Sequence, residues 1–485
     1  MRFLHIHLSI VLAWPWMCGA WPAETLNPAL KGKRSFISRD GVKRTIFQHE
    51  ATGAQIDFVT DSGICETTPG VKQYSGYLNV GGDEMMWFWF FEARNQPDTA
   101  PLAVWLNGGP GCSSMVGLFQ ENGPCHFVNG SSTPSLNPYS FNEYANMLYI
   151  DQPLGTGFSH GTGQDFTSST VTAAPYVWKL LQAFFAQFPK YRNRDFGLFT
   201  ESYGGHYGPE FASYFTSQNA AIAAGSLIGQ KISLVALGIN NGWFDPIIQE
   251  KASIHYSFSN GYKPIISASQ HTMYLDSYET YCLPLLKKCG EVTGTDEACE
   301  TAYHICYNTL EFSMSSVVDM DVYDVRKGFN NPLPPKTYVA YLRRPDVIKA
   351  IGASGKIPFT ECSDKLFSKF TKTGDNARSF LPTLSRVVRS GVTTLIWAGD
   401  ADWICNWYGG LESAHAIVYA GSEEFKKKEV STYFVDGVPG GSFKSVGNLS
   451  WMRVFEAGHH VPYYQPKLAL QAFKQTMQRK AVFST

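Results

Sequence analysis

The sequence predicts an α/β fold, in which a mostly parallel central sheet carries helices on both faces and a mainly helical insertion caps it. Short, almost wholly apolar runs at residues 102–106, 147–150 and 196–199 are typical of strands buried on both faces of a parallel sheet. Helical patterns alternate with such runs before residue 243 and again after residue 371, which is the rhythm of βαβ units.

Length and composition agree with one large α/β domain with insertions, or with two ordinary domains. The chain has 485 residues, of which 44% are hydrophobic and 17% charged, as in an ordinary globular protein. Its formal net charge of −1 gives no electrostatic reason to expect nucleic acid or an anionic membrane as a partner. We therefore expect neither.

The first twenty residues resemble a secretory signal peptide. Arg2 gives a charged start, residues 3–17 are mostly apolar, and Gly19 and Ala20 are small residues at which a peptidase cuts. The stretch is short for a membrane span and no later apolar run is longer, so no transmembrane helix is expected in the mature protein. A signal peptide fits secretion, our first expectation, and also delivery to a vacuole.

Residues 21–61 are polar, and we expect them to be irregular. Lys33-Arg34 and Lys43-Arg44 are either processing sites of a propeptide or simply solvated charges, and solvated charges are the more common explanation.

Strands and helices are expected to alternate after this segment. Residues 74–80 and 85–92 resemble an antiparallel hairpin joined by a Gly-Gly-Asp turn. The remaining expected elements are strands at 102–106, 147–150, 196–199, 232–239, 394–398 and 452–455, and helices at about 170–188, beyond residue 202 through Phe215, at 407–419 and at 466–478.

The alternation is lost between residues 243 and 371, where the sequence is helical or irregular and contains five cysteines. We interpret residues 243–371 as an insertion that caps the sheet. Residues 62–242 and 372–485 are then the first and second parts of the core.

Residues 195–207 have the outline of a nucleophile elbow, in which a strand reverses sharply into a helix and exposes a hydroxyl at the tip. Ser202 occupies the tip, and Gly204 supplies a small neighbour two residues later. Thr200 replaces the first glycine of the usual G-x-S-x-G pattern. Taken alone, such a stretch is more often a plain turn, so the rest of the chain must supply a histidine and an acid.

Suitable partners follow two later strands, at the edge where an open α/β sheet places its ligands. Asp400 and Asp402 come directly after one strand, and His459 and His460 after the last. The order serine, aspartate, histidine is that of α/β-hydrolases. A lone aspartate after a strand is most often a helix cap, but three such residues in this order favour a catalytic triad with Ser202.

The chain resembles the serine carboxypeptidases of the secreted or vacuolar type, and most closely the fungal ones. The resemblance runs from about residue 71 to residue 478. It is carried by WLNGGPGCSS at 105–114, DQPLGTGFS at 151–159, ESYGGHY at 201–207, NNG at 240–242, and the segments 399–406 and 458–462.

The resemblance implies an α/β-hydrolase fold and a serine-type carboxypeptidase that releases single residues from peptide C-termini without a metal or other cofactor. Ser202 is then the nucleophile, His459 the general base and acid, and Asp402 the acid that orients the imidazole. It also implies an oxyanion hole formed by the backbone N–H groups of Gly109 and Tyr203.

The resemblance further implies that Asn107, the Gly108 N–H group, Glu201 and Glu121 hold the free carboxylate of the substrate. Two crowded carboxyl groups cannot easily both ionise, so one of their pKa values should be raised. We therefore expect peptidase activity to be favoured at acid pH.

By resemblance, the substrate pocket contains Trp105, Val116, Gln120, Cys405 and His460. Val116, Gln120 and His460 differ from the residues of the yeast-like members. The preferred C-terminal residue is therefore not predicted.

Nine of the ten cysteines remain after removal of Cys18 with the signal peptide, which suggests four disulfides and one free thiol. The resemblance pairs Cys112 with Cys362 and leaves Cys405 free. For the rest we expect Cys282–Cys306, Cys289–Cys299 and Cys65–Cys125, although sequence alone leaves the connectivity open. Asn129 and Asn448 lie in glycan acceptor motifs.

Two rivals stand beside the peptidase. One is a serine carboxypeptidase-like acyltransferase or esterase with the same triad, and the other is a catalytically silent binding protein. Asn107, Glu121 and Glu201 favour the peptidase over the first, and the intact triad argues against the second. The expected partners are peptide or protein C-termini, bound by a monomer or a homodimer.

Overall fold

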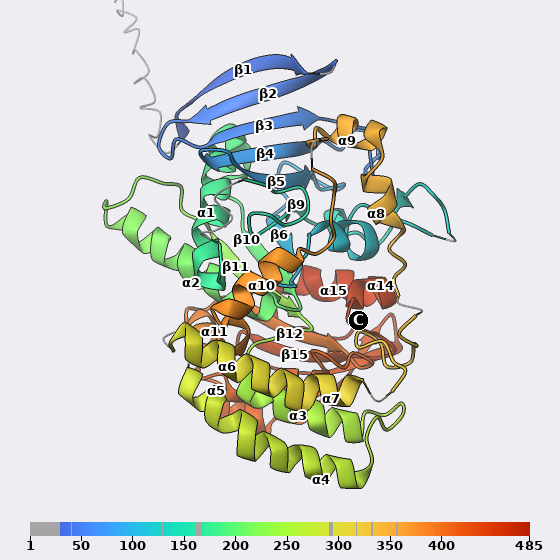
Figure 1. Ribbon diagram of the computed structural model, residues 1–485. Coiled ribbons are helices and arrows are strands. Elements are labelled where there is room, and N and C mark those ends of the chain that lie inside the picture. Colours follow the sequence, from blue (N-terminus) through green and yellow to red (C-terminus); the bar gives the residue numbers. More distant parts are fainter. Residues whose placement is uncertain are drawn as a thin grey trace, which may run out of the picture.

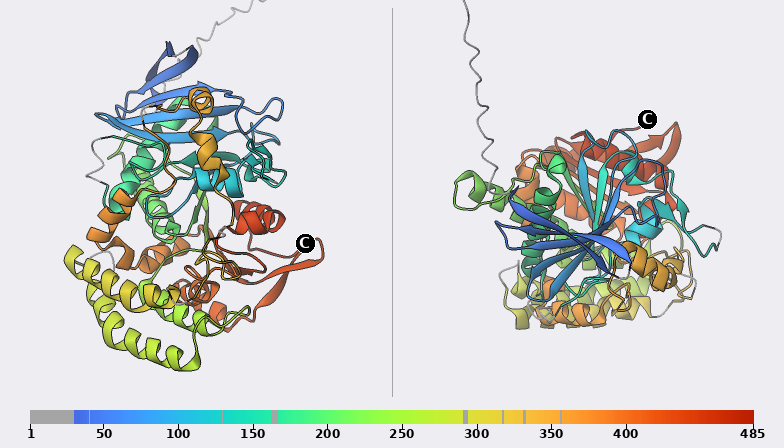
Figure 2. Two further views of the ribbon diagram at one scale, coloured as in Figure 1. Left: turned by 45° about the vertical axis from the view of Figure 1, so that its right-hand side comes forward. Right: turned by 90° about the horizontal axis from the view of Figure 1, so that it is seen from above.

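The computed structural model describes residues 30–39, 41–128, 130–161, 167–290, 294–316, 318–330, 333–355 and 357–485. The expected signal peptide, Cys18 and the acceptor Asn129 lie outside these residues. Thirteen strands form one strongly twisted sheet (Figures 1 and 2). In spatial order they are β1 Gly32–Arg39, β2 Val42–His49, β3 Gln55–Thr60, β4 Gln73–Gly81, β5 Glu84–Phe91, β9 Asn146–Ile150, β6 Leu102–Leu106, β10 Phe196–Glu201, β11 Leu234–Asn240, β12 Thr393–Gly399, β15 Leu449–Val454, β14 Val438–Val446 and β13 Ser431–Val435.

The centre of the sheet is parallel, as predicted. Strands β9, β6, β10, β11, β12 and β15 pair in parallel, whereas the neighbours at both ends are antiparallel. Alternate residues of β6 enter two separate cores, with Leu102 and Val104 on one face and Ala103 and Trp105 on the other. Such a strand is buried on both faces, which explains its wholly apolar sequence.

Helices cover both faces of the sheet, which confirms the predicted fold class. Helices α1 Thr170–Gln187, α2 Gly204–Ala223, α11 Leu381–Arg389 and α12 Trp407–Ala416 pack on one face, and α15 Pro466–Met477 on the other. The antiparallel pair β13 and β14 and the helix α11 were not predicted from the sequence.

The N-terminal segment differs from its prediction. Residues 32–60 are not irregular, because they form β1, β2 and β3 at one end of the sheet. Ile56 and Phe58 are buried in the core, while β1 is almost entirely exposed. Exposed charged residues along β1 and β2 mask the strand signal. Whether the segment is processed as a propeptide stays a prediction.

The insertion consists of two parts. Helices α3 Pro246–Phe258, α4 Ala268–Ser277, α5 Leu283–Cys289, α6 Asp296–Cys306 and α7 Phe312–Ser315 form a layer at the opposite end of the molecule from β1 (Figure 1). Helices α8 Thr337–Leu342 and α9 Pro345–Ile351 instead join the core, where the Ser75 hydroxyl on β4 donates to the Ile351 carbonyl. None of the helices in the described ranges is long and apolar enough to cross a membrane.

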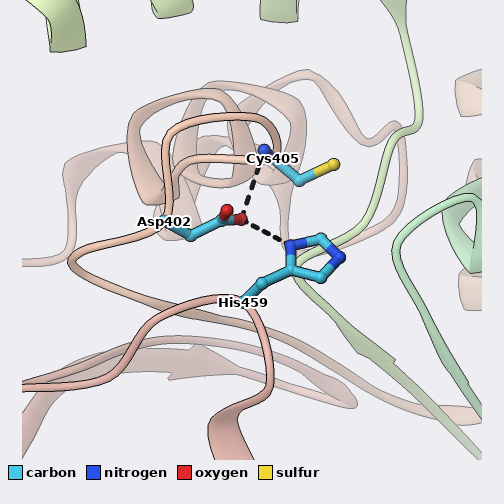
Figure 3. A group of neighbouring side chains, drawn as sticks. All are labelled: Asp402, Cys405 and His459. Carbon is cyan, nitrogen blue, oxygen red and sulfur yellow. Dashed lines mark hydrogen bonds and ion pairs between the residues drawn. The ribbon is translucent and has the colours of Figure 1, made fainter. Parts of the chain in front are cut away.

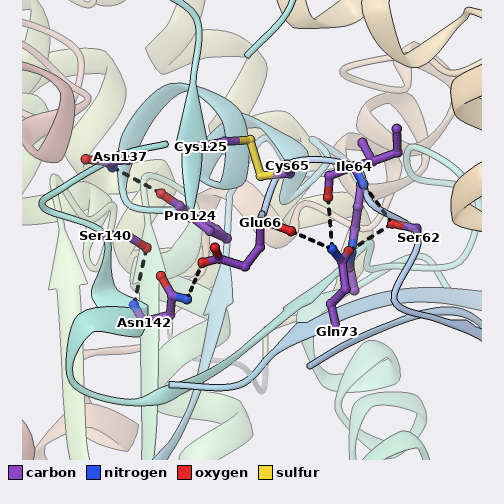
Figure 4. The surroundings of a disulfide bond; sticks show 12 residues. Ser62, Ile64, Cys65, Glu66, Gln73, Pro124, Cys125, Asn137, Ser140 and Asn142 are labelled. Carbon is purple, nitrogen blue, oxygen red and sulfur yellow. Dashed lines mark hydrogen bonds between the residues drawn. A yellow bond between two sulfur atoms is a disulfide. The ribbon is translucent and has the colours of Figure 1, made fainter. Parts of the chain in front are cut away.

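Four disulfides join the pairs that were expected: Cys65–Cys125, Cys112–Cys362, Cys282–Cys306 and Cys289–Cys299. Two of them, Cys282–Cys306 and Cys289–Cys299, lie within the helical layer and link its helices. Cys65–Cys125 ties the segment between β3 and β4 to the core, beside a hydrogen bond from Asn142 to Glu66 (Figure 4).

Candidate active site

Ser202 lies at the sharp turn between β10 and α2. Its φ of 63° is in the left-handed region, which a residue other than glycine adopts only where the surrounding structure imposes it. A Cβ atom at Gly204 would lie 2.5 Å from Thr200 Cβ, so glycine is required there. The Thr200 hydroxyl donates to the Gly204 carbonyl at 2.9 Å. Thr200, which stands where the usual pattern has a glycine, therefore stabilises the turn through this hydrogen bond.

Asp402 and His459 converge from the ends of two neighbouring strands (Figure 3). His459 Nδ1 lies 2.9 Å from Asp402 Oδ2, and both side chains are buried. Asn241 Nδ2 donates to the same oxygen at 2.7 Å. These contacts hold the imidazole in one orientation and leave its Nε2 atom free of this carboxylate. The motif containing Asn241 was noted in the sequence, but its role was not predicted.

Cys405 lies beside Ser202, the predicted nucleophile. Its side chain lines the same cavity as Ser202, and its backbone N–H group donates to Asp402 Oδ2 at 3.2 Å. Among the cysteines of the described ranges it is the one without a disulfide. Burial, followed by the negative charge of Asp402, raises the pKa of the Cys405 thiol well above its ordinary value. The thiol is therefore protonated at neutral pH.

The Gly108-Gly109 segment lies directly against the elbow. A Cβ atom at Gly108 would come within 2.4 Å of the Tyr203 backbone nitrogen and 2.9 Å of Ser202 Cβ. Only a glycine allows this approach. Gly109 and Tyr203 line one cavity together with Ser202, where their N–H groups suit an oxyanion hole.

The Tyr203 side chain is anchored away from this cavity. Its hydroxyl donates to Asp375 Oδ2 at 2.6 Å, and Asp375 also accepts the backbone N–H group of Thr170. This anchor was not predicted from the sequence, because its members lie more than thirty residues apart.

A cluster of two carboxyl groups, one amide and one imidazole lies on the other side of the serine. Asn107 Oδ1 accepts N–H groups from Trp105 and Gly117, which directs its Nδ2 atom toward the carboxyl groups. That atom donates to Glu121 Oε1 at 3.2 Å and to Glu201 Oε1 at 3.0 Å. Trp105 is fully buried, so it supports Asn107 from beneath the pocket.

His460 belongs to this cluster. Its Nδ1 atom lies 3.0 Å from Glu201 Oε1 and 3.6 Å from Glu121 Oε1. Burial alone would lower the pKa of His460, but the two carboxyl groups raise that pKa well above its ordinary value. His460 is therefore a cation. Asn240 Nδ2 completes the surroundings of Glu201, donating to Oε2 at 2.7 Å.

The two carboxyl groups differ in protonation. Burial, followed by the charge of Glu201, raises the pKa of Glu121. Burial also acts to raise the pKa of Glu201, but the charge of His460 and its hydrogen bond outweigh burial and hold this pKa below its ordinary range. Glu121 is thus the carboxyl that keeps a proton, and no N–H or hydroxyl donor in the described residues reaches its Oε2 atom.

A second cavity, of about 660 Å³, begins at this cluster. Glu121 and Gln120 contribute to its wall, and Gln120 Nε2 donates to the carbonyl of Pro335 at 2.9 Å. Val116 is buried at the start of the same turn of helix. Aromatic and proline side chains form most of the remaining wall: Phe119, Phe127, Tyr139, Pro334, Pro462 and Tyr463.

Asn448, one of the expected glycan acceptors, uses its side-chain amide differently. Its Nδ2 atom donates to the carbonyl groups of Val388 and Val392 at 2.8 and 2.7 Å. A glycan would have to be attached at this nitrogen, so the structure does not support modification of Asn448.

The parallel sheet, the elbow at Ser202 and the Asp402–His459 pair define a serine hydrolase of the α/β-hydrolase class. The family model for serine carboxypeptidases matches residues 63–479, and the chain belongs to that family.

Known relatives agree with this assignment. Carboxypeptidase S1 of Penicillium janthinellum is 60% identical over 428 residues, which cover 88% of this chain and 100% of the relative. Carboxypeptidase S1 homolog A of Arthroderma otae is 32% identical, over 99% of this chain and 83% of that protein. The crystal structure of Kex1(delta)p, a prohormone-processing carboxypeptidase from Saccharomyces cerevisiae, superposes with a TM-score of 0.72 at 25% identity, covering 85% of this chain and 94% of that chain.

Proposed function

We propose that this protein releases single residues from the C-termini of peptides and proteins through an acyl-enzyme on Ser202. The observation that carries the proposal is the cluster of Asn107, Glu121, Glu201 and His460 directly beside the nucleophile. An esterase needs no buried acid next to its serine, whereas an exopeptidase must recognise a terminal carboxylate.

The chemistry follows from the arrangement of the groups. Ser202 attacks the terminal peptide carbonyl while His459, oriented by Asp402, accepts the hydroxyl proton. The N–H groups of Gly109 and Tyr203 stabilise the oxyanion. The imidazolium gives its proton to the leaving amine, which departs as the free C-terminal residue. Water then attacks the acyl-enzyme with His459 as the base.

The carboxylate cluster explains why a rising pH should slow the reaction. Glu201 and His460 carry opposite charges, so the cluster is neutral while Glu121 is protonated. In that state the Glu121 proton and the amide of Asn107 can donate to the substrate carboxylate. Loss of the proton would leave the Glu121 carboxylate facing the substrate carboxylate, and two like charges repel each other. Peptide binding should therefore weaken as the pH rises through the pKa of Glu121.

A comparison of two substrates tests the proposal. We expect a blocked dipeptide with a free carboxylate to be cleaved much faster than the same dipeptide as a C-terminal amide. Ser202→Ala should lower both rates by at least about a thousandfold. Equal rates on the amide and the free acid would favour the esterase or acyltransferase, and unchanged release by Ser202→Ala would exclude this serine as the nucleophile.

We further infer secretion, with vacuolar delivery as the alternative, from the apolar N-terminal sequence that begins with Arg2. A monomer or a homodimer is the expected assembly. Intact-mass analysis of the mature protein from its native host tests the first inference, since retention of residues 1–20 would contradict it.

A further inference from the structure

A cavity of about 1140 Å³ lies between α3 of the helical layer and α12 of the core. Residues of α3 form the largest part of its wall, and α4, α5 and α12 contribute most of the rest. The described residues that line this cavity include none of those that line the cavity at Ser202. A ligand bound here is therefore independent of the proposed function.

Two histidines on neighbouring helices line this cavity, and their ring nitrogens face each other. His255 is in the last turn of α3 and His271 is near the start of α4, and these helices lie side by side (Figure 1). His255 Nδ1 is 3.0 Å from His271 Nε2, and both residues are partly exposed. The ring of Phe258 stacks on that of His271 with centroids 4.7 Å apart. One small group entering the cavity could thus contact both nitrogens.

Both rings can offer a lone pair to such a group. A neutral imidazole donates from one nitrogen and accepts at the other, so the two rings form one hydrogen bond with each other. Burial, followed by the charges of His271 and Lys251, lowers the pKa of His255. His255 is therefore neutral at pH 7, and the neutral imidazole is the form that coordinates a metal ion. Each ring would then carry its proton on its other nitrogen.

The separation of the two nitrogens suits coordination of one shared ion. Imidazole nitrogens bind such ions at about 2.0–2.1 Å, so nitrogens 3.0 Å apart subtend an angle of about 95° at the ion. This angle is close to the angle of about 90° between neighbouring ligands of a square-planar ion, the geometry of copper(II). It is smaller than the tetrahedral angle that zinc adopts in proteins.

The charges around the histidines are compatible with a bound cation. Glu412 on α12 lines the same cavity, and its negative charge acts on His255. Two of the three lysines that line the cavity are paired with carboxylates, Lys251 with Glu279 at 3.1 Å and Lys426 with Glu423 at 2.9 Å. Their positive charges are thus largely compensated, and Glu412 favours a cation between α3 and α12.

We propose that His255 and His271 bind a divalent transition-metal ion of the copper(II) type, with water in the remaining coordination positions and Glu412 as the facing carboxylate. Because the two ligands come from α3 and α4, the bound ion links two helices of the helical layer. The peptidase mechanism above uses neither histidine. This metal site is thus a second binding site, separate from the catalytic groups.

Titration with copper(II) followed by electron paramagnetic resonance tests the proposal. The mature protein is used at neutral pH without a histidine tag, and it carries Cys405→Ser because a free thiol also binds copper. We expect the first equivalent of copper(II) to show coupling to the nitrogens of two imidazoles. Coupling to fewer than two would overturn the proposal and would leave the pair as a hydrogen bond between two histidines.

Single substitutions in the same background locate the ion. His255→Gln and His271→Gln should each remove one imidazole from the spectrum and weaken copper(II) binding by at least about tenfold. Circular dichroism before copper is added shows whether each variant is folded, and if one is not, the other decides.

His304→Gln is the matched control. His304 belongs to α6 of the same layer, its side chain is 52% exposed, and its Nε2 atom lies 3.9 Å from Glu300. The control should keep the two-imidazole spectrum and the affinity of the background protein. A two-imidazole spectrum that persists in the variants of His255 and His271 would place the ion elsewhere and contradict the proposal.

Discussion

At the scale of single residues, protonation distinguishes this site from a generic serine hydrolase. Ser202, Asp402 and His459 form the proposed triad. Beside them lies a buried cluster in which Glu121 is protonated, Glu201 is an anion and His460 is a cation. Burial raises the pKa of Glu121, whereas the adjacent imidazolium keeps Glu201 ionised. The expected fall of activity with rising pH is thus attached to Glu121 and not to the residue next to the serine.

Replacement of Glu121 tests this assignment. Glutamine keeps an N–H donor at every pH, so Glu121→Gln should abolish the fall of kcat/KM as the pH rises through the Glu121 pKa. The measurement is the pH profile for a peptide with a free carboxylate. The C-terminal amide of the same peptide is the control, since its profile should not respond to the substitution. An unchanged profile for the free acid would assign the titration to another group.

Cys405 provides a second test at this scale. Because its thiol pKa is raised, the thiolate fraction at neutral pH is small, and alkylation by iodoacetamide should be slow. An organomercurial should bind the thiol and, since Cys405 lies beside Ser202, block activity. Cys405→Ser should remove the mercurial sensitivity. Mass spectrometry that found no free thiol in the mature protein would contradict the assignment.

At the scale of elements, the N-terminal strands complete the sheet instead of preceding it. Arg44 on β2 is buried, donates to Asp57 at 2.6 Å and reaches the carbonyl of Gly352 at 2.9 Å. Lys33 and Arg34 lie on β1, which is exposed. The two basic pairs that looked alike in the sequence are therefore not equally accessible to a peptidase.

Limited proteolysis distinguishes the two pairs. Trypsin should cut the native protein after Lys33 or Arg34 and leave the bond after Arg44 intact, because cleavage there requires β2 to separate from β3. N-terminal sequencing and intact mass give the positions of the cuts. Equally rapid cleavage after Arg44 would show that β2 separates readily from β3. That result would favour the interpretation of this segment as a propeptide.

At the scale of the whole molecule, disulfides join parts that lie far apart in the sequence. Cys112–Cys362 spans 250 residues and links the segment that follows Gly109 to the C-terminal end of residues 243–371, whereas Cys289–Cys299 spans 10 residues within the helical layer. The backbone hydrogen bond from Ser113 to Glu361, at 2.7 Å, lies beside the first. Loss of a long closed loop should destabilise the protein more than loss of a short one.

Two double variants test this ordering. In the loop-entropy treatment, Cys112→Ser with Cys362→Ser should cost about 5 kcal/mol of unfolding free energy, against about 3 kcal/mol for Cys289→Ser with Cys299→Ser. Thermal midpoints measured under identical conditions compare the two. A larger loss for the short loop would mean that native-state packing, and not loop entropy, dominates.

The sequence by itself determined the central strands, the elbow at Ser202 and the order of the triad. These are local signals, because strand burial appears in consecutive residues and a sharp turn requires small neighbours at fixed spacing. The roles of Asp402 and His459 and the disulfide pairs came from resemblance to a family. The strands of residues 32–60 were missed, because exposed charges conceal their alternation.

Only the tertiary structure decided which groups share protons. The cluster around Glu121 joins residues from distant parts of the chain, and a pKa depends on burial and on neighbouring charges whatever their position in the sequence. The same holds for the anchor that Asp375 gives to Tyr203. The sequence could therefore predict a nucleophile, but not the charge state of the groups around it.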